Sequence, residues 1–362
     1  MIYPKVVIII LNWNGREDTI ECLDSLKHIT YPNYEILLVD NGSTDGSVEC
    51  FRERHPGMEI IENEENLGFA EGNNVGIRRA MDEGTDYVLL LNNDTVVDKN
   101  FLEELVTVAE SDELIGLVQP KILYYDDLSI NSTGFICDIF ISTKHRGRYE
   151  KDEKQYDNSI EEGFFYASGC SLLIKRNLLL ELGNECFDRY LFAYYEDVDL
   201  SWIARLLNFK IVYCPTSTCY HKEGKTSGGF NPETTYWKNR NRIRIIIKNY
   251  SMRNIIWILP IVILLEFFVS IIISFHRKDI KYFYSFLKGF VWNLNNLGNT
   301  LEKRALVQSN KKVDDEYVIK YMKKQSLEII FLINKFENFI PHSSVAVGCA
   351  VAAFDYISKI FS

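Results

Sequence analysis

Three carboxylates lie within four residues of one another near the middle of the chain. Glu196, Asp197 and Asp199 are flanked on both sides by aromatic and apolar residues. Like charges at this spacing repel, and apolar neighbours disfavour ionisation, so we expect at least one carboxyl group to have a raised pKa. Such a carboxylate suits general-base chemistry near neutral pH. The same acids would equally suit the first turn of a helix over residues 201–207, at the positive end of its dipole.

The chain upstream of these acids alternates between apolar β-branched runs and helical patterns. It predicts buried strands that alternate with helices, and therefore a mostly parallel sheet with right-handed crossovers. The predicted strands are residues 6–11, 34–39, 58–61, 87–91 and 114–119. The predicted helices are residues 17–27, 46–54 and 102–110, together with one that ends near residue 81 after a glycine-rich loop over residues 66–76.

Polar clusters follow three of these strands at the point where each strand ends. They occupy residues 12–14, 40–45 and 92–94 and are rich in Asn and Asp. Ligands of parallel α/β sheets bind beyond the carboxyl ends of the strands. The placement of the clusters therefore favours a nucleotide site at this edge of the sheet.

The pattern is less regular from residue 121 onward. We predict a strand over residues 164–174 with an interruption at Gly169, which indicates a bulge or the close approach of a ligand. A short helix over residues 177–182 precedes the acidic segment. A further strand over residues 210–214 is expected to stop at Pro215, with His221 seven residues beyond its end.

The last third of the chain is apolar and basic. Residues 255–274 are long enough to cross a bilayer, and further amphipathic or apolar stretches cover residues 282–297, 327–339 and 345–361. We predict a helical region that lies in or dips into the cytoplasmic leaflet, with one true span or a buried helical core as alternatives. Six cations and no acid occupy residues 238–253, as a solvated helix face or as a site for anionic lipid headgroups or a lipid-linked diphosphate.

Composition narrows the class of protein further. The chain has 362 residues and a net charge of −10, which argues against a nucleic-acid-binding protein. Its eight cysteines are scattered without a CxxC pair, so we expect reduced thiols in a cytoplasmic protein.

The order of the motifs resembles the inverting family 2 glycosyltransferases with the GT-A fold, in particular their rhamnosyltransferase-like branch. The matching segments are IILNWNG (9–15), LVDNGSTDGS (38–47), NLGFAEGNNVG (66–76), LLNND (90–94), ASGC (167–170), YEDVDL (195–200) and YWKNRN (236–241), with His221 between the last two. The resemblance implies a GT-A catalytic domain over residues 1–250. Its nucleotide-sugar-binding half would be residues 1–120 and its acceptor and catalytic half residues 121–250, followed by a helical, membrane-associating region over residues 251–362.

The resemblance also implies roles for individual residues. Asp197 matches the catalytic base, with Glu196 and Asp199 in support. The nucleotide-sugar site would comprise Asn12, Asn14, Asp40, Asn41, Gly68, Asn73, Asn93 and Asp94, with the glycine-rich loop closing over the nucleotide. Arg146, Trp237 and Arg240 would contact the acceptor or the diphosphate.

A divalent cation, Mn²⁺ or Mg²⁺, is implied at Asp94 and His221. Residues 92–94 stand where the family has its DXD motif, and the first acid is replaced by Asn92. This replacement removes one charge from the expected metal site. The cation would take up charge on the departing diphosphate, while Asp197 removes a proton from the acceptor hydroxyl.

The implied function is inverting transfer of a rhamnose-like sugar, a hexose or galactofuranose from a UDP- or dTDP-linked donor. The acceptor would be a glycan or a lipid-linked glycan at the cytoplasmic face of the cell membrane. A sugar-nucleotide pyrophosphorylase shares such a sheet, but Gly15 and Arg16 alone do not supply its triphosphate-binding loop. A catalytically degenerate glycan-binding or scaffold protein is the other alternative, favoured by Asn92 and disfavoured by the intact acidic segment.

Overall fold

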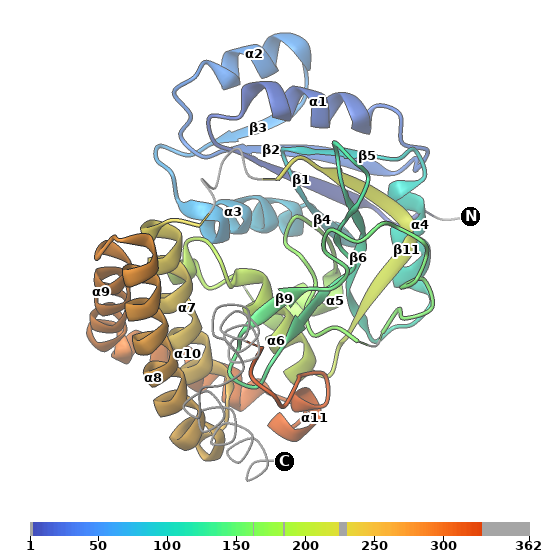
Figure 1. Ribbon diagram of the computed structural model, residues 1–362. Helices are drawn as coiled ribbons and strands as arrows, with labels where there is room; N and C mark the ends of the chain where they lie inside the picture. The colour runs from blue at the N-terminus through green and yellow to red at the C-terminus, as the bar shows by residue number, and fades with distance from the viewer. Residues whose placement is uncertain (1–2, 162, 184, 224–229, 328–362) are drawn as a thin grey trace.

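The computed structural model describes residues 3–161, 163–183, 185–223 and 230–327 (Figure 1). A central mixed sheet has the strand order β3-β2-β1-β4-β10-β6-β11-β5, with β7 paired to β6. Its strands are β1 (Val6–Asn12), β2 (Tyr34–Asp40), β3 (Glu59–Glu62), β4 (Tyr87–Asn92), β5 (Thr95–Val97), β6 (Ile115–Tyr124), β7 (Ile130–Ser132), β10 (Ser171–Lys175) and β11 (Lys210–His221). A separate small hairpin pairs β8 (Phe135–Cys137) with β9 (Thr143–His145).

The N-terminal half confirms the predicted alternation of strands and helices. Strands β3, β2, β1 and β4 are parallel neighbours. Figure 1 shows α1 and α2 on one side of these strands and α3 on the other. The helices are α1 (Arg16–Leu26), α2 (Ser47–Arg54), α3 (Gly68–Asp82) and α4 (Phe101–Glu110). Because the β-branched strands are covered on both faces, β1 is almost wholly buried.

The prediction of a glycine-rich loop over residues 66–76 was wrong, because helix α3 begins at Gly68. A Cβ atom at Gly72 would lie 2.7 Å from a methyl carbon of Leu11, and one at Gly76 would lie 2.8 Å from Ile9. These two glycines therefore let the helix pack closely against β1. Their role is to permit this contact within a helix, where the sequence pattern had predicted a loop.

Two strands of the second half also differ from the prediction. The strand expected over residues 164–174 is only β10, antiparallel to both β4 and β6. Pro215 does not stop the last strand: β11 continues to His221 through an irregularity between Cys214 and Thr218. Such an irregularity accommodates the missing N–H of proline. As a result His221 pairs with Thr95 of β5, immediately beside Asp94.

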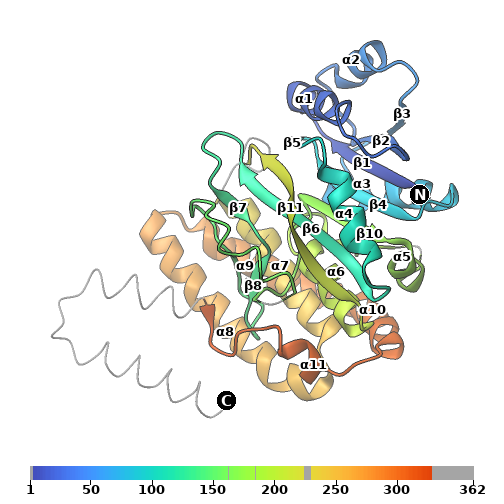
Figure 2. The ribbon, with the colours of Figure 1, turned by 90° about the vertical axis from the view of Figure 1, so that its right-hand side faces the viewer.

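The remaining helices are α5 (Arg176–Leu182), α6 (Glu196–Leu206), α7 (Pro232–Asn249), α8 (Met252–Arg277), α9 (Lys281–Asn295), α10 (Leu297–Asn310) and α11 (Asp315–Ile319). Helices α7 to α10 lie together beside α6, away from the N-terminal strands (Figures 1 and 2). Among the described residues, α8 is the one helix long and apolar enough to cross a membrane, by length and composition. The amphipathic segment predicted beyond residue 327 and the apolar tail lie outside the described residues.

Candidate active site

The strand-end cluster, which we define as Asn12, Asn14, Asp40, Asn41 and Asn93, is organised by hydrogen bonds between amides and carboxylates. Asn12 Nδ2 lies 2.8 Å from Asp40 Oδ1. The other carboxylate oxygen of Asp40 accepts the Ser43 N–H at 2.8 Å. Asn93 Nδ2 donates to the Thr19 hydroxyl at 3.0 Å, and that hydroxyl donates to Asn12 Oδ1 at 2.9 Å. Adjacent strands thus bring these side chains into one polar network, as their positions in the sequence predicted.

The turns beside this network are fixed in the same way. Asn14, with φ of 50°, accepts the Thr44 N–H at 2.8 Å through Oδ1. Asn41 accepts the Leu67 N–H at 3.1 Å and donates to the Gly68 carbonyl at 3.1 Å. The side chain of Asn41 therefore anchors the start of α3.

Two other residues predicted for the donor site, Gly68 and Asn73, make contacts that support the fold. Gly68 has φ of +78°, and a Cβ atom there would lie 2.6 Å from the Phe192 carbonyl oxygen. Asn73 is buried, and its Nδ2 donates to the Phe69 carbonyl of the same helix at 2.9 Å. Gly68 therefore permits contact with the segment before Asp197, whereas the Asn73 amide is engaged within α3.

Asp94 and His221 form a buried pair at the end of β4 and β11. His221 Nε2 lies 3.2 Å from Asp94 Oδ1. Burial alone would raise the pKa of Asp94, but the hydrogen bond and charge of His221 outweigh burial, so the pKa is lowered. His221 Nδ1 is buried and has no hydrogen-bond partner among the described residues. This pair holds a carboxylate in its ionised form, which a cation requires.

The pair would supply two ligands to a cation rather than a full coordination shell. No group of three or more His, Cys, Asp or Glu side chains that would hold a metal occurs in the part of the chain that the structure describes. Mg²⁺ and related cations often bind to one or two carboxylates and complete their shell with phosphate oxygens and water. The donor set therefore fits a cation that binds together with a diphosphate.

The Asp197 carboxylate lies at the start of α6, within reach of the strand ends. Its Oδ2 accepts the Gly169 N–H at 3.3 Å, and its Oδ1 accepts the Val198 N–H at 2.8 Å. The carbonyl of Cys170, next to Gly169, accepts the Asn92 N–H at 2.8 Å. Residues 168–170 thereby join the end of β4 to Asp197. Burial raises the pKa of Asp197 to about 6, within the range of an effective general base.

The two neighbouring acids have different surroundings. Glu196 is 9% exposed, and its Oε2 has no hydrogen-bond partner among the described residues. Burial, and then the charge of Asp197, raise the pKa of Glu196 well above its usual value. Asp199 is directed toward α7, where it accepts from Lys248 and, at 2.8 Å, from Asn249. The structure thus separates the three acids into one partly exposed carboxylate, one buried acid and one ion-pair partner.

The segment that leads into α6 has an unusual backbone. Phe192, Tyr194 and Tyr195 all have positive φ, at 62°, 69° and 72°. Each such conformation costs about 1–3 kcal/mol for a residue other than glycine and persists only where the surroundings enforce it. Strain of this kind is typical of functional sites, and here it precedes Asp197 directly.

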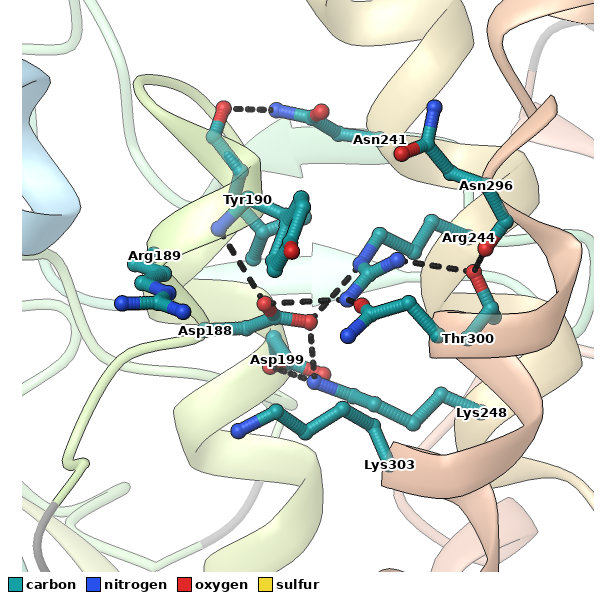
Figure 3. Close-up of polar contacts among 12 residues, drawn as sticks. Asp188, Arg189, Tyr190, Asp199, Asn241, Arg244, Lys248, Asn296, Thr300 and Lys303 are labelled. Carbon is teal, nitrogen blue, oxygen red and sulfur yellow. Dashed lines mark hydrogen bonds and ion pairs between the residues drawn. The ribbon is translucent and has the colours of Figure 1, made fainter.

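The cations of residues 238–253 do not form the solvated or lipid-binding face that the sequence suggested. Arg240, Arg242, Arg244 and Lys248 are 4%, 3%, 0% and 2% exposed, respectively. Arg242 pairs with Glu266. Arg244 pairs with Asp188, and Lys248 with both Asp188 and Asp199 (Figure 3). Internal carboxylates more than a dozen residues away in the sequence neutralise the charges of Arg242, Arg244 and Lys248, whereas Arg240 donates to the Tyr190 and Leu191 carbonyls. The earlier interpretation was therefore wrong for these four residues.

The three residues assigned to the acceptor or diphosphate are also engaged internally. Arg146 is buried, donates to the Thr133 carbonyl at 3.0 Å and lies over the Phe164 ring. Arg240 lies between the rings of Trp237 and Trp292, 4.2 Å from each centroid. Trp237 is less buried and stacks on Phe192 at 4.6 Å. Of the three, Trp237 is the residue whose side chain adjoins the segment before Asp197 at the surface.

Comparison with known proteins places this fold and site in a family. The architecture is that of GT-A transferases: the crystal structure of GalNAc-T7 with UDP, GalNAc and Mn²⁺ aligns with a TM-score of 0.55 and 17% identity, over 70% of this chain and 49% of that one. Residues 7–183 match the model of glycosyl transferase family 2. Residues 7–183 therefore match this family, and the chain has the GT-A fold.

Two curated relatives align over more of the chain than the family model does. The low-salt glycan biosynthesis hexosyltransferase Agl10 of Haloferax volcanii is 26% identical over 224 residues, which are 60% of this chain and 66% of that protein. The poly-beta-1,6-N-acetyl-D-glucosamine synthase of Staphylococcus epidermidis is 26% identical over 237 residues, 64% of this chain and 51% of that protein. This chain therefore spans between half and two thirds of the length of these relatives.

Sequence reasoning missed the residues that hold the acidic segment in place. Asp188 accepts from Arg244 and Lys248, and Asn241 donates to three carbonyls of residues 191–194. Asp188 and Asn241 lie nine and 44 residues from Asp197 in the sequence, with no local pattern that links them to it. The one available signal was that Asn241 ends the YWKNRN motif.

Proposed function

We propose that this protein transfers a sugar from a nucleotide-diphosphate sugar to a glycan or lipid-linked glycan acceptor, with inversion at the anomeric carbon. The observation that carries the proposal is the Asp197 carboxylate. It is partly buried, has a pKa of about 6, and is joined through residues 168–170 to the strand end that bears Asp94. This arrangement provides a base beside a donor site without a covalent nucleophile.

In the proposed reaction, Asp197 accepts the proton of the acceptor hydroxyl as its oxygen attacks the anomeric carbon of the donor. The Gly169 and Val198 N–H groups hold the two carboxylate oxygens and keep the carboxylate oriented. Glu196, with its raised pKa, keeps its proton to higher pH than an exposed glutamate, which limits charge repulsion beside the base. The nucleoside diphosphate departs with the bonding electrons.

The donor would bind at the strand-end cluster, with Asp40, Asn12 and Asn41 at the base and ribose. Asp94 and His221 would hold Mn²⁺ or Mg²⁺ at the diphosphate. A bound cation would supply positive charge to the leaving group. Asp94 is already ionised and buried for this role, although Asn92 leaves the site with one carboxylate fewer.

The sugar would be a hexose or a related sugar, including rhamnose-like sugars and galactofuranose, on a UDP or dTDP carrier. The names of the two relatives, a hexosyltransferase and an N-acetylglucosamine polymer synthase, support a hexose-class donor. They equally support a role in the synthesis of a cell-surface polysaccharide or a protein-linked glycan.

We also propose that helices α8 and α9 lie against the cytoplasmic face of the cell membrane. Their outer side carries exposed apolar residues, among them Ile256, Phe268 and Phe275 at 70%, 58% and 86% exposure. The one acid within the apolar run of α8, Glu266, faces inward and pairs with Arg242. The exposed apolar side chains along α8 suit partial insertion among lipids, or one span by α8.

A groove of about 590 Å³ between α7 and α9 supports a lipid-linked acceptor. It extends from Trp237, beside the segment before Asp197, to the exposed side of α9. Its lining is apolar apart from a few charged groups, and Lys288 lies over the Tyr236 ring. An isoprenoid or acyl chain would leave the membrane along this groove with its phosphate near the lysines.

A two-step experiment tests the proposed reaction. A thermal-shift screen of UDP- and dTDP-linked sugars, with and without Mn²⁺, should show stabilisation by the correct donor, because a ligand that binds the folded state stabilises it by mass action. Proton NMR of the product should then show the anomeric configuration opposite to that of the donor. Retained configuration would contradict the mechanism. Binding of a glycan without turnover of any donor would favour the degenerate scaffold protein.

Vesicle binding tests the membrane contact separately. A variant with Ile256, Phe268 and Phe275 all changed to Gln should sediment less with vesicles of anionic phospholipid. Leu128→Gln, at a residue that is 55% exposed in the catalytic half, is the matched control and should leave sedimentation unchanged. Equal sedimentation of both variants would place the membrane contact elsewhere.

A further inference from the structure

The backbone just before Asp197 is held in conformations that it would not keep without support. The Ala193 N–H donates to the Leu191 carbonyl at 2.7 Å, and Phe192 between them has φ of 62° and ψ of −67°. This is a γ-turn of the rare, strained type. Tyr194 and Tyr195 follow with left-handed φ, which bulky residues seldom adopt. Because α6 starts immediately afterwards, whatever holds this segment also sets the position of the Asp197 carboxylate.

One buried side chain contacts most of this strained segment. Asn241 Nδ2 lies 2.8, 2.9 and 2.6 Å from the carbonyl oxygens of Leu191, Ala193 and Tyr194. Asn241 is fully buried, and its Oδ1 accepts from Arg240 Nε at 2.9 Å. That bond orients the amide with its two N–H donors toward the segment. A single amide thus contacts three carbonyls, which its two N–H groups can serve only with one hydrogen shared between two acceptors.

The rest of the same face of α7 holds the flanks of the segment. Asn241, Arg244 and Lys248 are spaced by three and four residues, so they share one side of the helix. Arg244 donates to both oxygens of Asp188, at 2.8 and 3.1 Å, and Lys248 bridges Asp188 and Asp199 (Figure 3). The chain is therefore fixed on α7 before the strained turn and again within α6.

We propose that Asn241 is a positioning residue for the transfer reaction, which holds the strained backbone of residues 191–195 and so aims the Asp197 carboxylate at the acceptor hydroxyl. The proposal rests on the proposed function in that Asp197 is taken as the base. Asn241 contacts neither the strand-end cluster nor Asp94 and His221 in any described interaction. Its loss should therefore affect the chemical step and leave donor binding intact.

A matched pair of variants tests this role. Asn241→Ala removes the contacts to the strained segment. Asn293→Ala, the control, removes a buried amide that donates at 2.9 Å to the Arg240 and Gly289 carbonyls of helices α7 and α9. Asn241→Ala should lower kcat by about 30- to 100-fold, since misplacement of a catalytic group by about 1 Å costs on this order. The Kd for UDP with Mn²⁺ should change less than threefold in both variants, and Asn293→Ala should keep its kcat.

Amide hydrogen exchange gives a readout that does not depend on turnover. Peptides that cover residues 190–199 should exchange faster in Asn241→Ala than in the wild type, and Asn293→Ala should leave them unchanged. Should Asn241→Ala not fold, Asn241→Ser, which keeps a single hydroxyl donor, takes its place. Unchanged exchange in this peptide would overturn the proposal even if no donor were known. If Asn241→Ala exchanged faster than the wild type but the wild type transferred no sugar, the result would contradict the proposed function instead.

A variant that relieves the backbone strain separates the proposed role of Asn241 from a simple loss of packing. Tyr194→Gly places glycine at a φ of 69°, where it has no steric penalty. In this background the loss of kcat caused by Asn241→Ala should shrink to less than about tenfold, because less support is needed. An equal loss in both backgrounds would show that Asn241 does not act through the strained segment.

Discussion

The strand-end cluster and the acidic segment, the two parts of the proposed site, are held in place by different means. Asn12, Asp40 and Asn93 lie at the ends of adjacent parallel strands and bind one another there. The segment from Asp188 to Asp199 is held mainly by α7, whose residues come some 50 positions later. A donor site can be formed by the topology of a sheet, whereas the base needs a dedicated support from outside its own element.

This difference also explains the charge of α7. A helix with arginine at residues 240, 242 and 244 and lysine at residue 248 reads as a surface feature. The structure buries all four cations. Asp188, Asp199 and Glu266 supply compensating charge to three of them, and Arg240 lies between the rings of Trp237 and Trp292. Buried pairs of this kind add little net stability relative to apolar residues, but removal of one partner is costly.

The largest effect should come from the base itself. Asp197→Asn keeps the shape of the side chain but cannot accept the proton, so kcat should fall by about 10³-fold or more. Binding of UDP or dTDP, measured by calorimetry, should stay within about threefold of the wild type. If the variant retained more than a few per cent of activity, Asp197 would not be the base, and the two regions would not divide binding from chemistry as described.

Removal of the Lys248 ammonium group, which joins Asp188 to Asp199, should have the largest effect on stability. Lys248→Met leaves Asp199 without its charged partner, which should lower the free energy of unfolding by about 3–5 kcal/mol in urea titrations. Lys312→Met is the matched control, since Lys312 is half exposed and pairs with Glu181, and it should cost less than about 1 kcal/mol. A Lys248→Met variant of unchanged stability that no longer binds anionic vesicles would restore the lipid-binding interpretation.

Binding of the nucleotide at Asp94 and His221 should depend on a metal ion, whereas the structure of the acidic segment should not. Asp94→Asn and His221→Ala should each weaken Mn²⁺-dependent binding of UDP or dTDP by at least about tenfold. EDTA should weaken binding in the wild type and have little further effect in the variants. Wild-type binding and transfer that were insensitive to EDTA would remove the metal from the proposal and leave Asp94 and His221 as a structural pair.

A smaller effect should appear in the dependence on pH. Because the pKa of Asp197 is about 6, kcat/KM should fall tenfold per pH unit below about pH 6 and stay level just above it. The pKa of Asp197 is higher in the folded protein than in the unfolded chain, so folding favours the protonated carboxyl. The stability that this protonated group contributes is present at low pH and is lost as pH rises through 6. Asp197→Asn should therefore melt a few degrees above the wild type at pH 8 and lose that advantage near pH 4. An advantage that grew at low pH would contradict the raised pKa.

The sequence alone determined the parts of this protein that local patterns encode. The β-branched runs specified strands buried on both faces, and their alternation with helices specified a mostly parallel sheet. Polar residues after the strands marked the edge where we propose that the donor binds. Asp94 and Asp197 were recognisable because their short motifs lie in order along the chain. These features depend on side-chain period and on neighbours close in sequence.

Only the tertiary structure decided which polar residues are free to act and which support others. Asp197 and Asp199 are two residues apart in one motif, yet one is partly exposed beside Gly169 and the other is paired with Lys248. Gly72 and Gly76, which the sequence pattern placed in a loop, instead allow a helix to approach β1. Burial and pairing depend on which distant segments meet, because the free energy of a charge is set by its surroundings in three dimensions.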